Sequence, residues 1–132
     1  MPAKKAAILV VDDDVRILLM MRRILELEGY SVVVAADGDS ALAMVEKQRP
    51  DLAILDIMMP GQDGLQVLDI IRRNYDFPVI MLTGIDEVTT LRDAVGLGAD
   101  DYVRKPFSVR ELLARVRVKL RRAEQCPPHS KR

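Results

Sequence analysis

The sequence has one cysteine, one histidine and no apolar run long enough to cross a membrane. Its single cysteine, Cys126, excludes an internal disulfide and suits a reducing compartment. A membrane span needs about 18 consecutive apolar residues, whereas the apolar run over 6–11 ends in three aspartates. We therefore expect a cytoplasmic protein that does not engage a membrane.

An excess of charge of either sign is also absent, because 20 basic residues balance 20 acidic ones. No overall charge favours nucleic acid as a partner, so we expect this domain to bind none by itself. With 132 residues, of which 49% are hydrophobic, the chain can bury one sizeable core. We expect one domain over 1–123, followed by a flexible tail or linker stump over 124–132.

Short apolar runs alternate five times with segments whose apolar residues recur at helical spacing. The expected strands are 6–11, 30–35, 52–55, 79–82 and 102–103, and the expected helices are 15–28, 39–48, 65–73, 86–97 and 109–122. Asp14, Asp39 and Ser108 are the expected helix caps. Strands that are apolar on both faces are typical of parallel sheets covered by helices, so the sequence predicts an α/β fold.

The last expected helix carries two stripes at helical spacing. The apolar stripe, which we expect to face the core, contains Val109, Leu112, Leu113, Val116 and Leu120. The second stripe is mostly charged and contains Glu111, Arg115, Val118 and Arg122. On the residues alone, a solvated face and a contact surface are both open for this second stripe.

Polar residues follow four of the five expected strands. The first strand runs into Asp12 and Asp13, the third into Asp56, the fourth into Thr83 and the fifth into Lys105. Ligands of an open parallel sheet bind beyond the carboxyl ends of its strands. We therefore expect these five side chains to gather at one edge of the sheet.

Such a cluster suits phosphoryl transfer assisted by a divalent cation. Neighbouring carboxylates disfavour one another's ionisation, and a bound cation removes that penalty. The hard oxygen ligands, without a second histidine or cysteine, favour Mg²⁺ over zinc. Lys105 and Thr83 add a positive charge and a hydroxyl donor, which phosphoryl transfer needs around the equatorial oxygens. Asp56 stands alone at its strand end and is the expected nucleophile, whereas Asp12 and Asp13 suit the metal.

Four segments make the chain resemble the receiver domain of two-component response regulators over about 8–122. They are ILVVDDD at 8–14, DLAILDIMMPGQDG at 51–64, VIMLTG at 79–84 and GADDYVRKPF at 98–107. The resemblance implies a flavodoxin-like (βα)5 three-layer sandwich with a parallel five-stranded sheet in the order 2-1-3-4-5. It also implies a phosphoacceptor that catalyses its own phosphorylation and dephosphorylation, rather than an enzyme.

The resemblance assigns the metal and phosphate ligands. Asp56 would be the phosphoacceptor, with Asp12, Asp13, Asp56 and the backbone carbonyl of Met58 around Mg²⁺ or Mn²⁺. The only histidine, His129, lies in the expected tail, so the phosphoryl group should come from a histidine kinase, a phosphotransfer protein or a small phosphodonor.

The resemblance also assigns a switch and an output surface. Thr83 and Tyr102 would form the switch, and the Lys105–Pro106 peptide bond would be cis. The chain looks like the OmpR/PhoB subfamily, which controls transcription and dimerises through the elements over 86–97, 102–103 and 109–122. The candidate dimer residues are Asp100, Asp101, Glu111, Arg115 and Arg122.

Three alternatives remain on the residues alone. A haloacid dehalogenase-type phosphatase has acids spaced like Asp12 and Asp14, but it wants Thr or Val at the position of Arg16. A flavodoxin-type flavin carrier needs a phosphate cradle after the first strand, where three aspartates would repel a phosphate. A degenerate receiver would act only through protein contacts, and the complete set of acids, hydroxyl and lysine argues against it.

Overall fold

The chain folds around a parallel sheet, seen in a computed structural model that describes residues 5–57, 64–84 and 98–125. The strands are β1 (Ala7–Val11), β2 (Ser31–Ala35), β3 (Leu52–Asp56), β4 (Val79–Thr83) and β5 (Asp101–Arg104). Their order is β2-β1-β3-β4-β5, and all four pairings are parallel. The sheet order implied by the resemblance is therefore confirmed.

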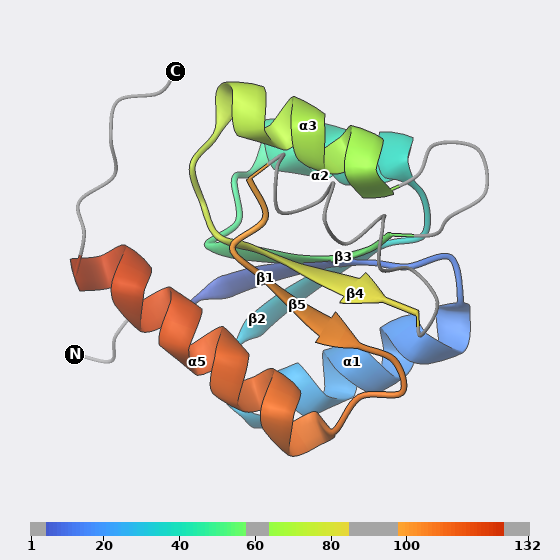
Figure 1. Ribbon diagram of the computed structural model, residues 1–132, viewed down its shortest axis with the longest axis vertical. Helices are drawn as coiled ribbons and strands as arrows, with labels where there is room; N and C mark the ends of the chain where they lie inside the picture. Colours follow the sequence, from blue (N-terminus) through green and yellow to red (C-terminus); the bar gives the residue numbers. More distant parts are fainter. Residues whose placement is uncertain (1–4, 58–63, 85–97, 126–132) are drawn as a thin grey trace.

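Helices cover both faces of the sheet, which gives three layers (Figure 1). The described helices are α1 (Val15–Leu27), α2 (Gly38–Lys47), α3 (Gly64–Asn74) and α5 (Val109–Gln125). The expected helix over 86–97 lies outside the described residues, as do Met58 and most of the expected tail. None of the described helices combines the length and apolar character that a membrane crossing requires.

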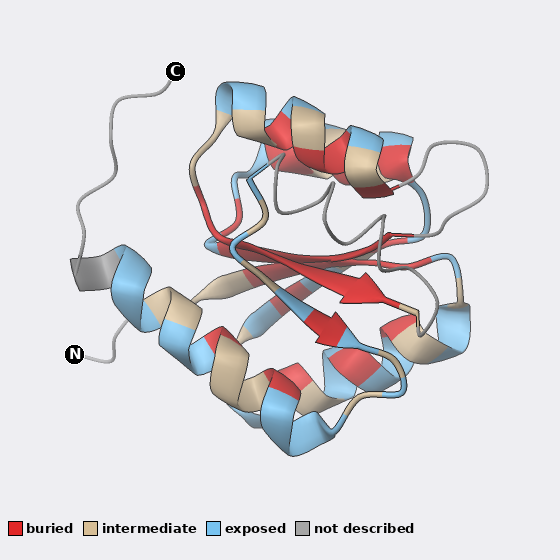
Figure 2. Cartoon of the chain, viewed as in Figure 1, coloured by how far each residue is buried: buried red, intermediate tan, exposed pale blue. Residues whose placement is uncertain are grey.

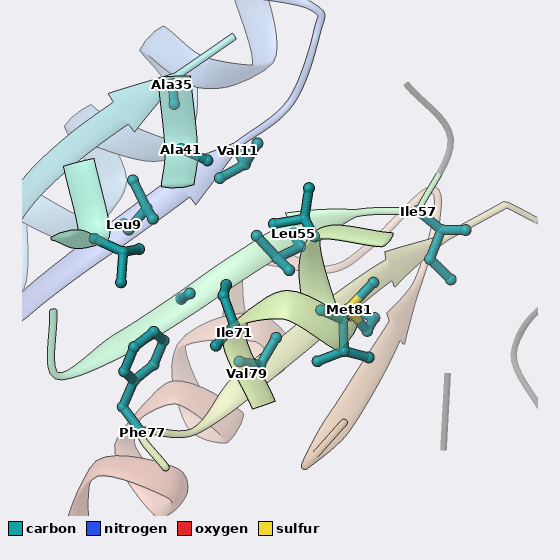
Figure 3. Packing of buried hydrophobic residues seen from close by; sticks show 14 residues of the cluster. Leu9, Val11, Ala35, Ala41, Leu55, Ile57, Ile71, Phe77, Val79 and Met81 are labelled. Carbon is teal, nitrogen blue, oxygen red and sulfur yellow. The ribbon is translucent and has the colours of Figure 1, made fainter. Parts of the chain in front are cut away.

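Successive residues of each central strand enter opposite halves of the core. Ile8 and Val10 of β1 pack with α1 and α5, whereas Leu9 and Val11 pack with α2 and α3. Figure 2 shows the resulting burial along the central strands. Figure 3 shows the side chains of the half of the core that includes residues of α2 and α3. Every residue of β3 and β4 is buried. Continuous apolar strands therefore fix the middle of the sheet from both sides.

Two of the three expected helix caps are confirmed, and one is wrong. The carboxylate of Asp14 accepts a hydrogen bond from the Arg16 N–H at 2.9 Å, and this bond lowers the pKa of Asp14. The Ser108 hydroxyl accepts from the Glu111 N–H at 3.3 Å. Asp39, however, lies inside the first turn of α2.

The residue that caps α2 is Asp37, two positions before the expected one. Its extended backbone lets its carboxylate reach the Ser40 N–H at 2.7 Å, and this bond lowers the pKa of Asp37. Both aspartates carry the same acceptor, and the helix begins at Gly38, one residue before the expected start. Asp39 instead places its negative charge near the positive end of the helix dipole.

The core stripe of α5 is one residue shorter than expected. Leu112 and Val116 are fully buried, and Leu113 and Leu120 pack partly against them. Val109, however, is 40% exposed. It is the first residue of the helix, so it precedes the turn that reaches the sheet.

Gly64, the first residue of α3, lies against the backbone at the end of β3. A Cβ atom there would lie 2.2 Å from the Asp56 carbonyl oxygen and 2.9 Å from the Ile57 Cα. Backbone atoms cannot rotate away, so we expect Gly64→Ala to lower the free energy of unfolding by about 3 kcal/mol, the upper part of the overpacking range. Urea denaturation measures this loss.

Gly29→Ala provides the matched control for this prediction. Gly29 has φ +96°, and its added Cβ would meet no atom within 4 Å. Only backbone strain of about 1 kcal/mol is then expected. A loss for Gly64→Ala no larger than that for Gly29→Ala would contradict the packing explanation.

Candidate functional site

Three carboxylates meet at the carboxyl edge of the sheet. Asp12 and Asp13 follow β1, and Asp56 ends β3, the neighbouring strand. One oxygen of each carboxylate lies within 4.8 Å of the others. Asp12 and Asp56 are only 1% and 5% exposed, while Asp13 faces solvent. The structure thus brings together the three acids that the sequence placed at this edge.

Local hydrogen bonds separate the roles of the three consecutive aspartates after β1. The Asp12 backbone N–H donates to the Ala35 carbonyl at 3.2 Å, which extends the pairing with β2. Asp12 Oδ1 accepts from the Asp14 N–H at 2.9 Å, so its carboxylate is fixed in orientation. Asp14 caps α1 and is not one of the three clustered acids. Asp13 therefore completes the cluster.

Lys105 brings a positive charge into this cluster. Its Nζ lies 3.2 Å from Asp56 Oδ2 and 3.4 Å from Asp12 Oδ2. Burial by itself lowers the pKa of the Lys105 ammonium, but the charges of Asp56 and Asp12 outweigh burial and hold the pKa above its ordinary value. Lys105 is therefore protonated at neutral pH. The Lys105–Pro106 bond is cis, as the resemblance implied.

Thr83 and Tyr102 occupy contrasting positions on neighbouring strands. Thr83 is buried at the end of β4, and its carbonyl accepts from the Lys105 backbone N–H at 2.7 Å. Its hydroxyl makes a long bond of 3.3 Å to the Gly84 carbonyl, which leaves it able to turn toward a stronger acceptor. Tyr102 on β5 is 42% exposed. Of the two proposed switch residues, Thr83 is thus buried in this structure and Tyr102 is exposed.

The donor set fits a hard divalent cation. The cluster contains three carboxylates, and the one ammonium group beside it contacts Asp12 and Asp56, so a surplus of negative charge remains. Its ligand atoms are all oxygens, and two of the carboxylates are almost completely removed from solvent. Taking such charges out of water is costly unless opposite charge compensates them. These residues could therefore hold a metal ion.

The candidate dimer residues make contacts within the chain. Arg115 Nη1 donates to both carboxylate oxygens of Asp101, at 2.7 and 2.9 Å, and Arg115 Nη2 donates to Glu111 at 3.1 Å. Arg122 is exposed near the end of α5. Asp100 pairs with Arg72 of α3 instead. Asp101, Glu111 and Arg115 are thus linked into one charged network, which does not include Asp100.

Sequence reasoning missed Arg72. Its guanidinium is mostly buried and binds chain segments up to 28 residues away. The sequence signal is weak, because α3 ends with two adjacent arginines and only Arg72 turns inward. The neighbouring buried residues Leu68 and Ile71 would have favoured Arg72 over Arg73 as the inward one.

The sequence matches the family described as response regulator receiver domain over residues 8–117. It is 47% identical over 124 residues to a protein named probable transcriptional regulator ycf27 from Cyanophora paradoxa. That match covers 94% of this chain and 52% of the relative, so the chain spans about half the length of that protein.

Solved structures agree with this match. A CheY-like response regulator receiver domain protein from Methanospirillum hungatei has a TM-score of 0.88 and 35% identity, covering 92% of this chain and 98% of that one. The receiver domain of NtrX from Brucella abortus has a TM-score of 0.82 and 38% identity, covering 86% and 98%. The matches therefore favour a receiver domain over the hydrolase and the flavin carrier that the residues alone had left open. The chain belongs to the response regulator receiver domain family.

Proposed function

We propose that Asp56 accepts a phosphoryl group from a phosphohistidine of a partner protein, with Mg²⁺ held by Asp12, Asp13 and Asp56. Membership in the receiver family implies a histidine kinase as the partner and makes the chain a phosphoacceptor rather than a conventional enzyme. The observation that carries the proposal is the Lys105 ammonium 3.2 Å from the Asp56 carboxylate, within a cluster of three acids. A phosphotransfer protein or a small phosphodonor would serve the same chemistry.

The transfer needs a nucleophile and an in-line leaving group. One carboxylate oxygen of Asp56 attacks phosphorus as the bond from phosphorus to the histidine nitrogen breaks, and that nitrogen keeps the electron pair. The product is an aspartyl phosphate. The Lys105 ammonium stabilises the charge on the equatorial oxygens, and the Thr83 hydroxyl turns from the Gly84 carbonyl to donate to one of them. Each group belongs to a different strand end of the same edge.

The cation we propose is Mg²⁺, for which Mn²⁺ can substitute. Carboxylate oxygens suit both ions, and Mg²⁺ commonly shares its ligand shell with phosphate oxygens and water. When bound, it would offset the surplus negative charge and attract the incoming phosphoryl oxygens. The backbone carbonyl of Met58 is a further proposed ligand and lies outside the described residues.

We propose transcription control as the output, because the relative from Cyanophora paradoxa is named as a transcriptional regulator. Phosphorylation would draw the buried Thr83 hydroxyl toward the phosphate and turn Tyr102 inward from its exposed position, which shifts an existing balance between two states. The surface that changes would include the charged network of Asp101, Glu111 and Arg115, with Arg122 beside it, and would support a homodimer. We place the protein in the cytoplasm, where receivers typically act.

Asp56→Asn should abolish phosphorylation. The amide cannot act as the attacking carboxylate, and Asp12 and Asp13 are proposed to bind the cation instead of accepting the phosphoryl group. Incubation with acetyl phosphate and Mg²⁺, followed by intact mass spectrometry, should show one added phosphoryl group on the wild type and none on the variant. Asp39→Asn, the same change at an exposed helix position, should react like the wild type. A variant at Asp56 that is modified to the wild-type extent would contradict the assignment, whereas a wild type that stays unmodified would favour a receiver that acts only through protein contacts.

Mg²⁺ affinity should depend on Asp13 far more than on Asp14. Asp13 belongs to the acidic cluster, whereas the Asp14 carboxylate is occupied by the Arg16 N–H. Loss of groups that only orient a metal ligand costs about tenfold or more in affinity, so Asp13→Ala should weaken Mg²⁺ binding at least that much. Calorimetric titration measures both variants. If Asp14→Ala weakens Mg²⁺ binding more than Asp13→Ala does, Asp14 rather than Asp13 is the cation ligand.

A further inference from the structure

Polar contacts hold β5 in place more than burial does. This edge strand has four residues, and its one buried side chain is Val103. Tyr102 and Arg104 are exposed, whereas all residues of the neighbouring β4 are buried. A strand with so little apolar burial depends on its hydrogen bonds and end contacts for a fixed position. Lys105, the proposed phosphate ligand, directly follows this strand.

Arg72 fastens the opposite end of β5 to the rest of the fold. From the end of α3, its Nε donates to the Gly98 carbonyl at 2.8 Å and its Nη1 to the Phe77 carbonyl at 2.7 Å. Its Nη2 donates to the Asp100 carboxylate. The side chain is 14% exposed, so these bonds are largely shielded from water. One guanidinium thus joins α3, the connection into β4 and the segment that enters β5.

Asp100 completes this arrangement, which we call the Arg72 clamp: Arg72, Asp100 and the carbonyls of Phe77 and Gly98. Asp100 Oδ2 also accepts from the Val79 N–H at 2.7 Å, and the Asp100 N–H donates to the Val79 carbonyl at 3.0 Å. Asp100 is therefore tied to the first residue of β4 through both its side chain and its backbone. Figure 1 shows the starts of β4 and β5 side by side at this edge.

Gly98 makes room for the clamp. It has φ +105°, and a Cβ atom there would lie 3.2 Å from both Cγ and Cδ of Arg72. The glycine thus lets its own carbonyl face Arg72 while the side-chain stem passes close by. This close approach is a second observation that the position of Arg72 is closely determined by its surroundings.

The clamp and the phosphate site are joined by one short strand. Asp101, next to the clamp, pairs with Ile80, and Arg104 pairs with Thr83. The Lys105 N–H then donates to the Thr83 carbonyl at 2.7 Å. A slip of one residue along β4 would move β5 by about 3.3 Å and turn each side chain to the other face. Such a slip would separate the Lys105 ammonium from Asp56.

We propose that Arg72 and Asp100 are positioning residues for phosphoryl transfer. From the amino edge of the sheet they set β5 against β4 and so hold Lys105 beside Asp56. The sequence resemblance assigned Asp100 only to a dimer surface and gave Arg72 no role. The inference rests on the proposed phosphorylation of Asp56.

Arg72→Met tests this role, because it removes the guanidinium and keeps an extended apolar side chain. At a temperature where the variant is fully folded and with saturating Mg²⁺, its phosphorylation by acetyl phosphate should be about tenfold slower, since a displacement of about 1 Å can cost up to 10²-fold in rate. Its Mg²⁺ affinity should stay at the wild-type value, because Asp12 and Asp13 follow β1 and Asp56 ends β3, and the hydrogen bonds of the clamp involve neither strand. Arg73→Met, which removes the adjacent exposed arginine, should match the wild type in both measurements.

Hydrogen exchange gives an independent readout. In Arg72→Met, exchange should accelerate over 100–105, including the Lys105 amide, and stay unchanged in β1 and β3. Arg72→Lys should not restore the rate, because one ammonium cannot reach three separately placed acceptors as a guanidinium does. If Arg72→Met does not fold, Asp100→Asn is measured in the same way and should also slow the reaction.

Two results would overturn the proposal. One is a wild-type phosphorylation rate in a folded Arg72→Met or Asp100→Asn variant. The other is a parallel loss of rate and Mg²⁺ affinity, which would indicate general damage to the fold. Failure of the wild type to be phosphorylated would instead contradict the proposed function, so the two failures are distinguishable.

Discussion

Repulsion among three neighbouring carboxylates is the constraint on which this structure depends. Asp12 and Asp56 are buried side by side, with Asp13 at their rim, and Lys105 supplies one compensating charge. A cluster of this kind is unfavourable by itself, since like charges in a protein interior are weakly screened. The fold has to hold it in place with apolar packing elsewhere. Once held, the same repulsion makes the site attractive to a cation and to the oxygens that a cation brings with it.

The central strands β1 and β3 and the edge strand β5 are held in place by different interactions. Asp12 and Asp13 directly follow β1, and Asp56 ends β3; both strands are fixed by apolar packing on both faces, which holds the backbone that carries the acids. β5 contains Tyr102 and leads directly into Lys105; it is held by the Arg72 clamp at one end and by the bonds of Lys105 to Thr83 and the acids at the other. Polar contacts of this kind can be exchanged for others at small cost, whereas core packing cannot. The acids are thus a rigid base, and β5 is the element suited to respond to a phosphoryl group.

Local patterns in the sequence predicted most of the site and missed contacts between distant segments. Because the ends of parallel strands meet at one edge, a list of strand-closing residues was enough to bring Asp56 and Lys105 together. The cis bond after Lys105 came from the resemblance alone, since nothing in the local chemistry of an X-Pro bond selects it. The cap of α2 was misplaced because Asp37 and Asp39, two residues apart, offer the same acceptor, and only Asp37 precedes the first helical residue. Arg72 was missed because its partners lie far along the chain.

The stability of the metal-free chain tests the central role of charge repulsion most directly. Urea unfolding of the wild type and Asp56→Asn is compared in EDTA and in Mg²⁺. If repulsion dominates, Asp56→Asn should be more stable than the wild type in EDTA, because one of three like charges is gone. Mg²⁺ should then stabilise the wild type by mass action and the variant much less. A variant that is less stable than the wild type in EDTA, and equally stabilised by Mg²⁺, would contradict this account.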